Sequence, residues 1–228
     1  MEVLANAWLQ LFPTEQLALI LRGVFATLAI SIFSFLLGLA IGLPLAFVRT
    51  YMGKPFQLVV DVYEKVLRGI PELVLILFIY LGVGLSLGFT PLQNAFTAAT
   101  FSLGLRSGAH QSQIFRGAIR GIGGEQMVAA RALGLSRLRA IFYVMVPQTF
   151  VVATAGLGSE YSLLVKDSSL AFIIGVRDIM FWADRVRAIT LDMVFPTLAA
   201  AFLYIVLTFP LATYLDVWGS RKKKHLGL

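Results

Sequence analysis

The chain has 228 residues, of which 58% are hydrophobic and only 14% are charged, and its formal net charge is +7. Soluble globular domains carry about 45–50% apolar and about 25% charged residues, so the composition excludes a soluble enzyme and a soluble nucleic-acid-binding module. Basic loops on the cytoplasmic side of a membrane explain the positive charge better, and the lack of cysteine excludes a disulfide framework, a thiol nucleophile and a cysteine-based metal site.

Long uncharged stretches indicate the fold class. A helix needs about 20 mostly apolar residues to cross a hydrocarbon core about 30 Å thick, and four stretches of this length carry no charge: Gly23–Val48, Leu73–Leu105, Ala140–Ser159 and Met193–Leu215. The sequence therefore predicts an all-α protein, a polytopic membrane helical bundle in which residues 1–228 form a single transmembrane domain. We expect about five transmembrane helices, at 17–48, 56–87, 93–115, 140–159 and 193–215.

The first predicted span, residues 17–48, contains Gly38 and Gly42 four positions apart. Such a pair lies on one face of a helix and lets a second helix approach closely. Glycine is also common in membrane helices, so the pair can equally be without a packing role.

The second predicted span, residues 56–87, has a charged first half. Opposite charges recur at i,i+4 spacing, which places each pair on one helix face: Asp61 with Lys65, Glu64 with Arg68, and Arg68 with Glu72. These charges can pair with one another in a wet juxtamembrane turn, or they can face a bundle interior or a cavity. Pro71 beside Gly69 is expected to relax the helix.

The third predicted span, residues 93–115, carries Arg106 in its middle, close to Gly104 and Gly108. Placing an arginine at this depth costs about 2.5–3.5 kcal/mol on insertion scales. We therefore expect Arg106 to have a carboxylate, a carbonyl oxygen or a ligand as its partner.

Two polar segments separate the later spans. Residues 116–139 hold five arginines and a single acid, whereas residues 160–192 mix acids and bases around an apolar run, Ser168–Val176, that is too short to span. We expect 160–192 to be external, with the apolar run re-entrant or interfacial. Because basic loops stay in the cytoplasm, the N-terminus is predicted outside and the C-terminus inside, with Arg221–Lys224 on anionic headgroups.

The segment 116–139 predicts a short cytoplasmic helix bracketed by turns. Gly123 and Gly124 break the preceding helix, and Glu125 places an acid in the first turn of the next helix, where the helix dipole favours it. Gly134 is the residue type that ends helices in a left-handed cap, and Ser136 is a natural N-cap for the following helix. Small alanines would make this helix a smooth knob that can enter a groove on another protein.

The same segment resembles the EAA coupling loop of ABC importer permeases, and other stretches resemble the polar amino-acid uptake subfamily, the permeases for histidine, arginine and glutamine. These stretches follow the family's order from about residue 17 to 217: Arg68–Val74, Ser107–Ala109, Ile114–Ile119, Val146–Gln148, Ser159–Tyr161 and Lys166–Leu170. Two positions depart from the family's pattern. Val128 stands where an acid usually opens the motif, and Arg106 stands where a small or amide residue is usual.

The resemblance implies the transmembrane fold of a type I ABC importer and the function of its permease subunit, which translocates polar amino acids by alternating access. The implied partners are a second permease chain, identical or related, a cytoplasmic ATPase dimer that binds ATP and Mg, an extracytoplasmic solute-binding protein, the amino acid and membrane lipid. The implied location is the cell (inner) membrane, and nucleic acid is not a partner. The implied contacts with the ATPase are made by Glu125, Gln126, Ala129, Ala130, Arg131, Ala132, Leu133, Gly134, Leu135 and Ser136.

We expect no catalytic site in this chain. Its sole Gly-Lys pair, Gly53-Lys54, lacks the glycine five positions earlier that a phosphate-binding loop requires, so ATP hydrolysis and a bound cofactor are not expected here. His110 and His225 each lack a second ligand at metal spacing, and no metal site is expected.

A zwitterionic amino acid needs a cation for its carboxylate and an acceptor for its ammonium group. The candidates near the membrane midplane or the outer mouth are Glu160, Arg106, Arg68, Glu72 and Asp167. Glu160 directly follows an uncharged span and is the favoured acid for a substrate ammonium or guanidinium group, although it can instead pair with Lys166 or another base. Arg106 can contact the substrate carboxylate, or it can pair with Glu72 or Glu64.

The residues alone leave two other function classes open. An ion-coupled secondary transporter would need no ATPase and predicts internal repeats, of which none is visible. A passive channel subunit would not need the glycine-bracketed helix. Co-purification of a tightly bound soluble ATPase would separate an ABC permease from both.

Overall fold

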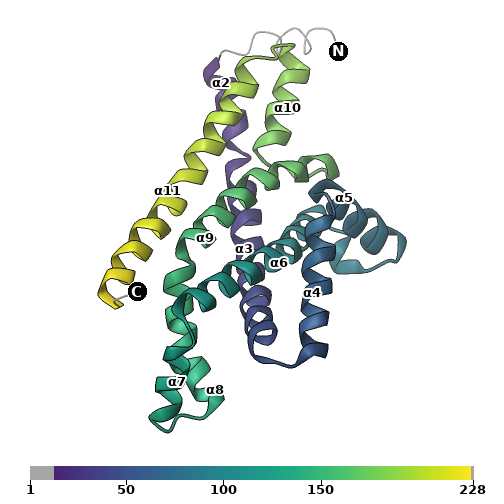
Figure 1. Cartoon of the computed structure of the whole chain (residues 1–228). Coiled ribbons are helices and arrows are strands. Elements are labelled where there is room, and N and C mark those ends of the chain that lie inside the picture. Colours follow the sequence, from purple (N-terminus) through teal and green to yellow (C-terminus); the bar gives the residue numbers. More distant parts are fainter. Residues whose placement is uncertain (1–12, 227–228) are drawn as a thin grey trace. The chain divides into compact units, whose positions relative to one another are not determined.

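The computed structural model of the chain describes residues 13–226, and every regular element in that range is helical, as the composition predicts. Figure 1 labels the main helices in chain order, from purple at the N-terminal side to yellow at the C-terminal side. The α-helices are α2 (Pro13–Leu21), α3 (Val24–Tyr51), α4 (Lys54–Gly69), α5 (Glu72–Leu77), α6 (Ala95–Ile122), α7 (Glu125–Ala132), α8 (Arg137–Ala140), α9 (Val146–Asp167), α10 (Ile179–Thr190) and α11 (Phe195–Leu226). Four further turns are π-helical, at η1 (Phe78–Ser86) and η3 (Ile141–Met145), or 3₁₀-helical, at η2 (Thr90–Leu92) and η4 (Ser168–Ile174).

The described residues contain three helical stretches that are long and apolar enough to cross a membrane: Pro13–Tyr51, Arg137–Ile174 and Phe195–Lys222. A fourth is counted if α4 and the Glu72–Ser86 helix form one broken span. Helix α6 has 28 residues, enough to cross, but it carries three arginines. The chain is therefore a multi-pass membrane protein whose polar spans are the second and third of the five that the sequence predicts.

The second predicted span, residues 56–87, is not one helix. Helix α4 ends at Gly69, α5 begins at Glu72, and the two directions differ by 103°. Pro71 precedes α5 in an extended conformation, with φ −57° and ψ 141°. Proline has no backbone N–H and disfavours the helical conformation of the residue before it, so the expected relaxation of the helix becomes a sharp corner.

The fourth predicted span, 140–159, is part of a longer helical stretch. Helix α9 passes through Ser159 and continues to Asp167, because residues 160–167 contain neither glycine nor proline to break it. The apolar run that follows forms the 3₁₀ turn η4, which closes on Gly175 in the left-handed region at φ 91°. The predicted external segment 160–192 thus begins as helix and also contains the helix α10.

The described residues form two compact units that the chain visits in turn. The first unit comprises residues up to 34, then 70–104 and 163–209, and the second comprises 35–69, 105–162 and the residues from 210 onward. In the first unit, apolar side chains of α2, α10 and α11 form a buried cluster that includes Ile20, Ile179, Ala183, Val186 and Leu203.

The first unit also buries a carboxylate, Asp178, at the start of α10. Its Oδ1 accepts a hydrogen bond from the backbone N–H of Phe181 at 2.8 Å, and the Tyr204 hydroxyl donates to Oδ2 at 3.2 Å. Asp178 is therefore the N-cap of α10. It lies outside the three apolar spans, and burial raises the pKa of its carboxyl to about 7.

In the second unit, α3 and α6 pack through the glycine pair of the first span. A Cβ at Gly42 would lie 2.8 Å from Gly108 O and 2.8 Å from Ser112 N, and one at Gly38 would lie 2.4 Å from the Gln111 side chain. Real Cβ atoms do not approach backbone this closely, so the close approach of α6 requires glycine at position 42. The helix-packing role that the spacing of the pair predicts is confirmed.

Candidate functional site

The predicted coupling helix is α7, and its two ends are formed as the sequence predicts. Gly123 has φ 81°, in the left-handed region, and interrupts the helical conformation before Gly124, the N-cap of α7. At the other end, Gly134 has φ 83°; its N–H donates to Arg131 O at 3.0 Å, and the N–H of Leu135 donates to Ala130 O at 3.2 Å. This pair of bonds is a Schellman motif, which satisfies carbonyls that the end of a helix leaves without partners.

The next helix, α8, starts where the sequence predicts. Ser136 is its N-cap, with ψ 159°, and its hydroxyl accepts a hydrogen bond from the N–H of Arg139. Helices α7 and α8 lie side by side (Figure 1). Helix α7 also contacts η3. The segment is thus a fixed two-helix corner whose shape is set by its own capping residues.

Two faces of α7 have different surroundings. Ala130 is buried, the half-buried Met127 packs against the apolar core of the second unit, and Gln126 Oε1 accepts a hydrogen bond from Gln148 Nε2 of α9 at 3.5 Å. The opposite face is exposed and apolar: Val128 is 68% exposed and Leu133 is 85% exposed, with Ala129 and Ala132 exposed beside them. The ten predicted contact residues therefore divide into inward-facing and outward-facing groups.

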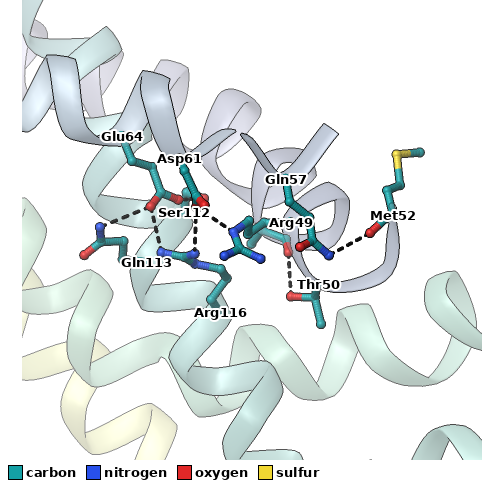
Figure 2. Close-up of polar contacts among 10 residues, drawn as sticks. Arg49, Thr50, Met52, Gln57, Asp61, Glu64, Ser112, Gln113 and Arg116 are labelled. Carbon is teal, nitrogen blue, oxygen red and sulfur yellow. Dashed lines mark hydrogen bonds and ion pairs between the residues drawn. The ribbon is translucent and has the colours of Figure 1, made fainter. Parts of the chain in front are cut away.

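A cluster of polar side chains lies between α4 and α6. Glu64 is 3% exposed, and its carboxylate accepts three hydrogen bonds from α6: from Ser112 Oγ at 2.7 Å, Gln113 Nε2 at 3.1 Å and Arg116 Nη2 at 2.7 Å. Figure 2 shows these side chains converging on the Glu64 carboxylate. A buried charge is tolerated only when it is paired and hydrogen-bonded, and this arrangement meets both conditions.

Asp61 extends this cluster towards α3. Its Oδ1 accepts a hydrogen bond from Arg49 Nε at 2.6 Å and lies 3.8 Å from Arg116 Nη1 (Figure 2). Asp61 and Arg49 are 29% and 28% exposed, so this pair is more hydrated than the one at Glu64. We refer to Arg49, Asp61, Glu64 and Arg116, with Ser112 and Gln113, as the Glu64 cluster.

The Glu64 cluster corrects one prediction and decides between two others. Among the described residues, Asp61 and Glu64 form their close ion pairs with arginines of α3 and α6 and not with Lys65 or Arg68 of their own helix, although the charge of Lys65 still acts on Asp61. The carboxylate of Glu64 is paired with side chains of α6. The charged half of span 2 could either pair within itself in a wet turn or face a protein interior, and Glu64 faces the interior.

The favoured substrate residue, Glu160, lies in α9 and is 4% exposed. Its Oε2 is 3.1 Å from His110 Nδ1 of α6, 50 positions away in the chain. Glu160 thus has a base as its partner, as one of the two predicted alternatives requires, although that base is His110 and not Lys166.

The other four candidates for the substrate site lie in α4, α5, α6 and α9. Arg106 is half-buried in α6, and Arg68 is exposed in the last turn of α4; with Glu160 they belong to the second unit. Glu72 begins α5 and Asp167 ends α9, both half-buried in the first unit. The five candidates are therefore divided between the units.

The sequence reasoning missed two features of these sites. His110 looked like an isolated histidine because its partner follows 50 positions later. The sequence predicts Arg116 in the basic loop 116–139, whereas α6 continues to Ile122 and includes it. A helical pattern could have placed Arg116 beside both other residues, Ser112 and Gln113, since it follows Gln113 by three positions and Ser112 by four.

Comparison with known proteins gives a consistent result. A family model described as "Binding-protein-dependent transport system inner membrane component" matches residues 38–224. The arginine transport system permease protein ArtQ of Bacillus subtilis is 32% identical over 92% of this chain and 94% of its own length. The glutamine transport system permease protein GlnP of Escherichia coli K12 is 33% identical over 95% of this chain and 97% of its own.

Solved structures agree with the sequence comparisons. A crystal structure of an amino acid ABC transporter with histidines superimposes with a TM-score of 0.78, at 30% identity, over 90% of this chain and 94% of that one. An inward-facing structure of the MetNI methionine ABC transporter gives a TM-score of 0.72 at 20% identity over 89% and 95% of the two chains, and that likeness concerns the fold alone.

Proposed function

The chain belongs to the family of binding-protein-dependent transport system inner membrane components, and from this premise we propose that it moves polar amino acids through the membrane. It is a permease subunit of an ABC importer, and such subunits are not themselves enzymes. Membership implies an ATPase and a solute-binding protein as partners. The amino-acid substrate is supported by relatives whose names specify arginine and glutamine.

Helix α7 is the surface that receives the ATPase in this proposal. The observation that carries it is the exposed apolar face of α7, on a helix whose two ends are fixed by Gly123 and Gly134. A groove of the ATPase would bury the exposed side chains of Val128 and Leu133. Because this contact is apolar, it does not require the acid that the family usually has at position 128. ATP and Mg are bound by the partner, and this chain contributes no cofactor site.

The assembly and orientation follow the same reasoning. Two permease chains, identical or related, combine with an ATPase dimer, and the N-terminus lies outside with the C-terminus in the cytoplasm. The positive-inside rule supports this orientation, because it puts the five arginines of 116–139 on the same side as α7 and the ATPase. Closure of the ATPase dimer would then drive the two permease chains between inward-facing and outward-facing states.

Within the membrane, Glu160 binds the cationic group of the substrate. Its buried carboxylate has a single described hydrogen-bond partner, His110, which a substrate ammonium or guanidinium group could replace. Hydrogen bonds that involve a charged group contribute about 1.5–3 kcal/mol, so a contact of Glu160 with the cationic side chain of the substrate would favour a basic amino acid over a neutral one. Arg106, Arg68, Glu72 and Asp167 remain candidates for the other groups of the substrate.

Reconstitution of the complete transporter tests the proposed function. The permease is co-expressed with its ATPase and partner permease, purified, and placed in liposomes with the solute-binding protein. We expect a stable complex whose ATP hydrolysis rises when a polar amino acid is added and stays low with an apolar one. Transport that proceeds without any ATPase subunit would contradict the proposal.

A matched pair of substitutions tests the role of Glu160. Glu160→Gln should weaken the apparent affinity for a basic amino acid by about 10- to 150-fold while leaving assembly intact, which corresponds to the loss of one charge-assisted hydrogen bond. Glu15→Gln makes the same chemical change on an exposed residue of α2 and should leave transport unchanged. Equal transport by both variants would remove Glu160 from the substrate site.

A further inference from the structure

An apolar groove lies in the second unit, between the C-terminal end of α3 and the α8–η3 turn. Its cavity volume is about 240 Å³, and its walls include Phe47, Tyr51, Leu138, Ile141 and Phe142. A second cavity of about 150 Å³ shares Phe47, Ile141 and Phe142 and extends along α3 to Leu43. The two cavities together form one elongated groove, and the 68% and 66% exposure of Leu138 and Phe142 opens it to the outside.

Water does not fill a groove of this kind. Its walls offer almost only apolar carbon, whereas an ordered water needs two to four polar partners. The ligand of the groove is therefore expected to have an extended hydrocarbon part.

One end of the groove carries a positive charge. Arg137 lines the larger cavity, donates from Nη2 to Tyr51 O at 2.6 Å, and places its guanidinium carbon 5.7 Å from the centre of the Tyr51 ring. Neither partner is anionic, and none of the ion pairs seen among the described residues involves Arg137. The guanidinium group keeps other N–H donors, and Arg presents five in all.

The depth of the groove distinguishes lipid from a water-soluble partner. The spans that the sequence predicts end at residue 48 and begin at residue 140, three positions from Tyr51 and from Arg137, so we expect the charged end of the groove at the membrane surface. Leu43 precedes Tyr51 by eight helical residues, which is about 12 Å along the helix axis. A soluble subunit docked at the membrane surface would not reach this deep, whereas an acyl chain lies there already.

We propose that this groove binds an anionic phospholipid, with its phosphate on Arg137 and one acyl chain along Phe47, Ile141 and Phe142. The shape and charge of the groove match the two parts of such a lipid. Because α8 contacts α7, the bound lipid would hold the corner that presents the coupling helix. The proposal concerns lipid only and does not depend on which solute is carried.

The test measures lipid retention by the purified permease complex. The complex is exchanged into mixed micelles of phosphatidylglycerol and phosphatidylcholine with identical acyl chains, and the retained lipids are quantified by native mass spectrometry. We expect phosphatidylglycerol to be enriched over phosphatidylcholine. Arg137→Gln should reduce this enrichment about fivefold, the effect expected for one basic residue at an anionic surface.

Two controls make the result specific. Arg120→Gln removes one positive charge from an exposed position in the last turn of α6 and should leave the enrichment unchanged. Ile141→Trp fills the groove and should reduce the retention of both lipids. Equal losses in Arg137→Gln and Arg120→Gln would show only a general surface-charge effect and would overturn the proposal, as would a wild-type complex without enrichment.

A last arm separates other occupants from lipid. Inorganic phosphate added in excess should not displace the retained phosphatidylglycerol, because it lacks the hydrocarbon part. Comparing the permease with and without its ATPase shows whether protein covers the groove. Loss of the lipid when the ATPase binds, or displacement by phosphate, would refute lipid as the occupant.

Discussion

The Glu64 cluster allows a sharp prediction about stability. Replacing Arg116 by glutamine leaves the carboxylate of Glu64, 3% exposed, with only Ser112 and Gln113 as donors. Removing one partner of a buried ion pair destabilises a protein by about 3–5 kcal/mol, because the remaining charge is uncompensated. We expect Arg116→Gln to fall near the lower end of this range, since two neutral donors remain.

The complementary change should be milder. Glu64→Gln keeps an acceptor for Ser112 and removes the buried charge, while Arg116 is 16% exposed and retains Asp61 at 3.8 Å. Loss of the charge-assisted hydrogen bond to Arg116 should lower the free energy of unfolding by about 1.5–3 kcal/mol. Asp61→Asn should cost less than about 1 kcal/mol, because the ion pairs of Asp61 are partly hydrated and exposed ion pairs contribute little.

The assay is equilibrium unfolding of the purified permease in a fixed detergent, compared across the single variants and the Glu64→Gln/Arg116→Gln double variant. The double variant should be more stable than the sum of the singles predicts, with a coupling of about 0.5–3 kcal/mol between contacting residues. Lys65→Gln, exposed on the same helix, is the control and should change stability by less than about 0.5 kcal/mol. Additive effects, or a loss in Asp61→Asn as large as in Arg116→Gln, would refute this account of the cluster.

Three further predictions concern backbone geometry and a buried acid. Gly134→Ala should destabilise the end of α7 by about 1–2 kcal/mol through its φ of 83° and loosen ATPase association in a pull-down, whereas Gly117→Ala, in open space on α6, should be neutral or stabilising. Gly42→Ala should reduce the yield of folded permease in size-exclusion chromatography, because its Cβ would lie 2.8 Å from α6 backbone atoms. The raised pKa of Asp178 means that the folded state binds its proton more tightly, so stability should fall as the pH rises from about 4 to about 7. Asp178→Asn, which keeps the N-cap, should flatten that fall in thermal unfolding at different pH values; an unchanged profile would contradict the assignment.

The features that the sequence predicted correctly depend on neighbours in the chain. Gly134 ends α7 through its own left-handed backbone conformation, and Ser136 starts α8 because its hydroxyl caps an N–H three positions later. The corner at Pro71 was expected as a relaxation for the same reason. Its 103° angle was not predicted, because the direction of the next helix depends on the packing of residues distant in sequence.

The position of helix ends was predicted less well where only composition was used. Charge content suggested that span 4 ends at Ser159, since Glu160 follows. The backbone continues as α9 to Asp167 because a charged residue does not stop a helix when its side chain finds a partner, as Glu160 does in His110. Composition reports where a chain becomes polar, and a helix ends where its backbone hydrogen bonds end.

The pairing of charges is the part that a single sequence leaves undetermined. The chain holds 12 acids and 19 lysines and arginines, so each carboxylate has many chemically equivalent partners, and sequence spacing favours those on its own helix. The structure instead joins Glu64 to Arg116 across 52 positions, because burial makes a fully hydrogen-bonded partner necessary and the facing helix supplies three donors. The glycine pair of α3 predicted a contact better than the charged residues did, because its effect is steric. The missing Cβ atoms allow close packing there, whichever helix is the partner. A steric requirement can therefore be predicted without identifying the partner, whereas an electrostatic pair can be assigned only once the fold has brought the two charges together.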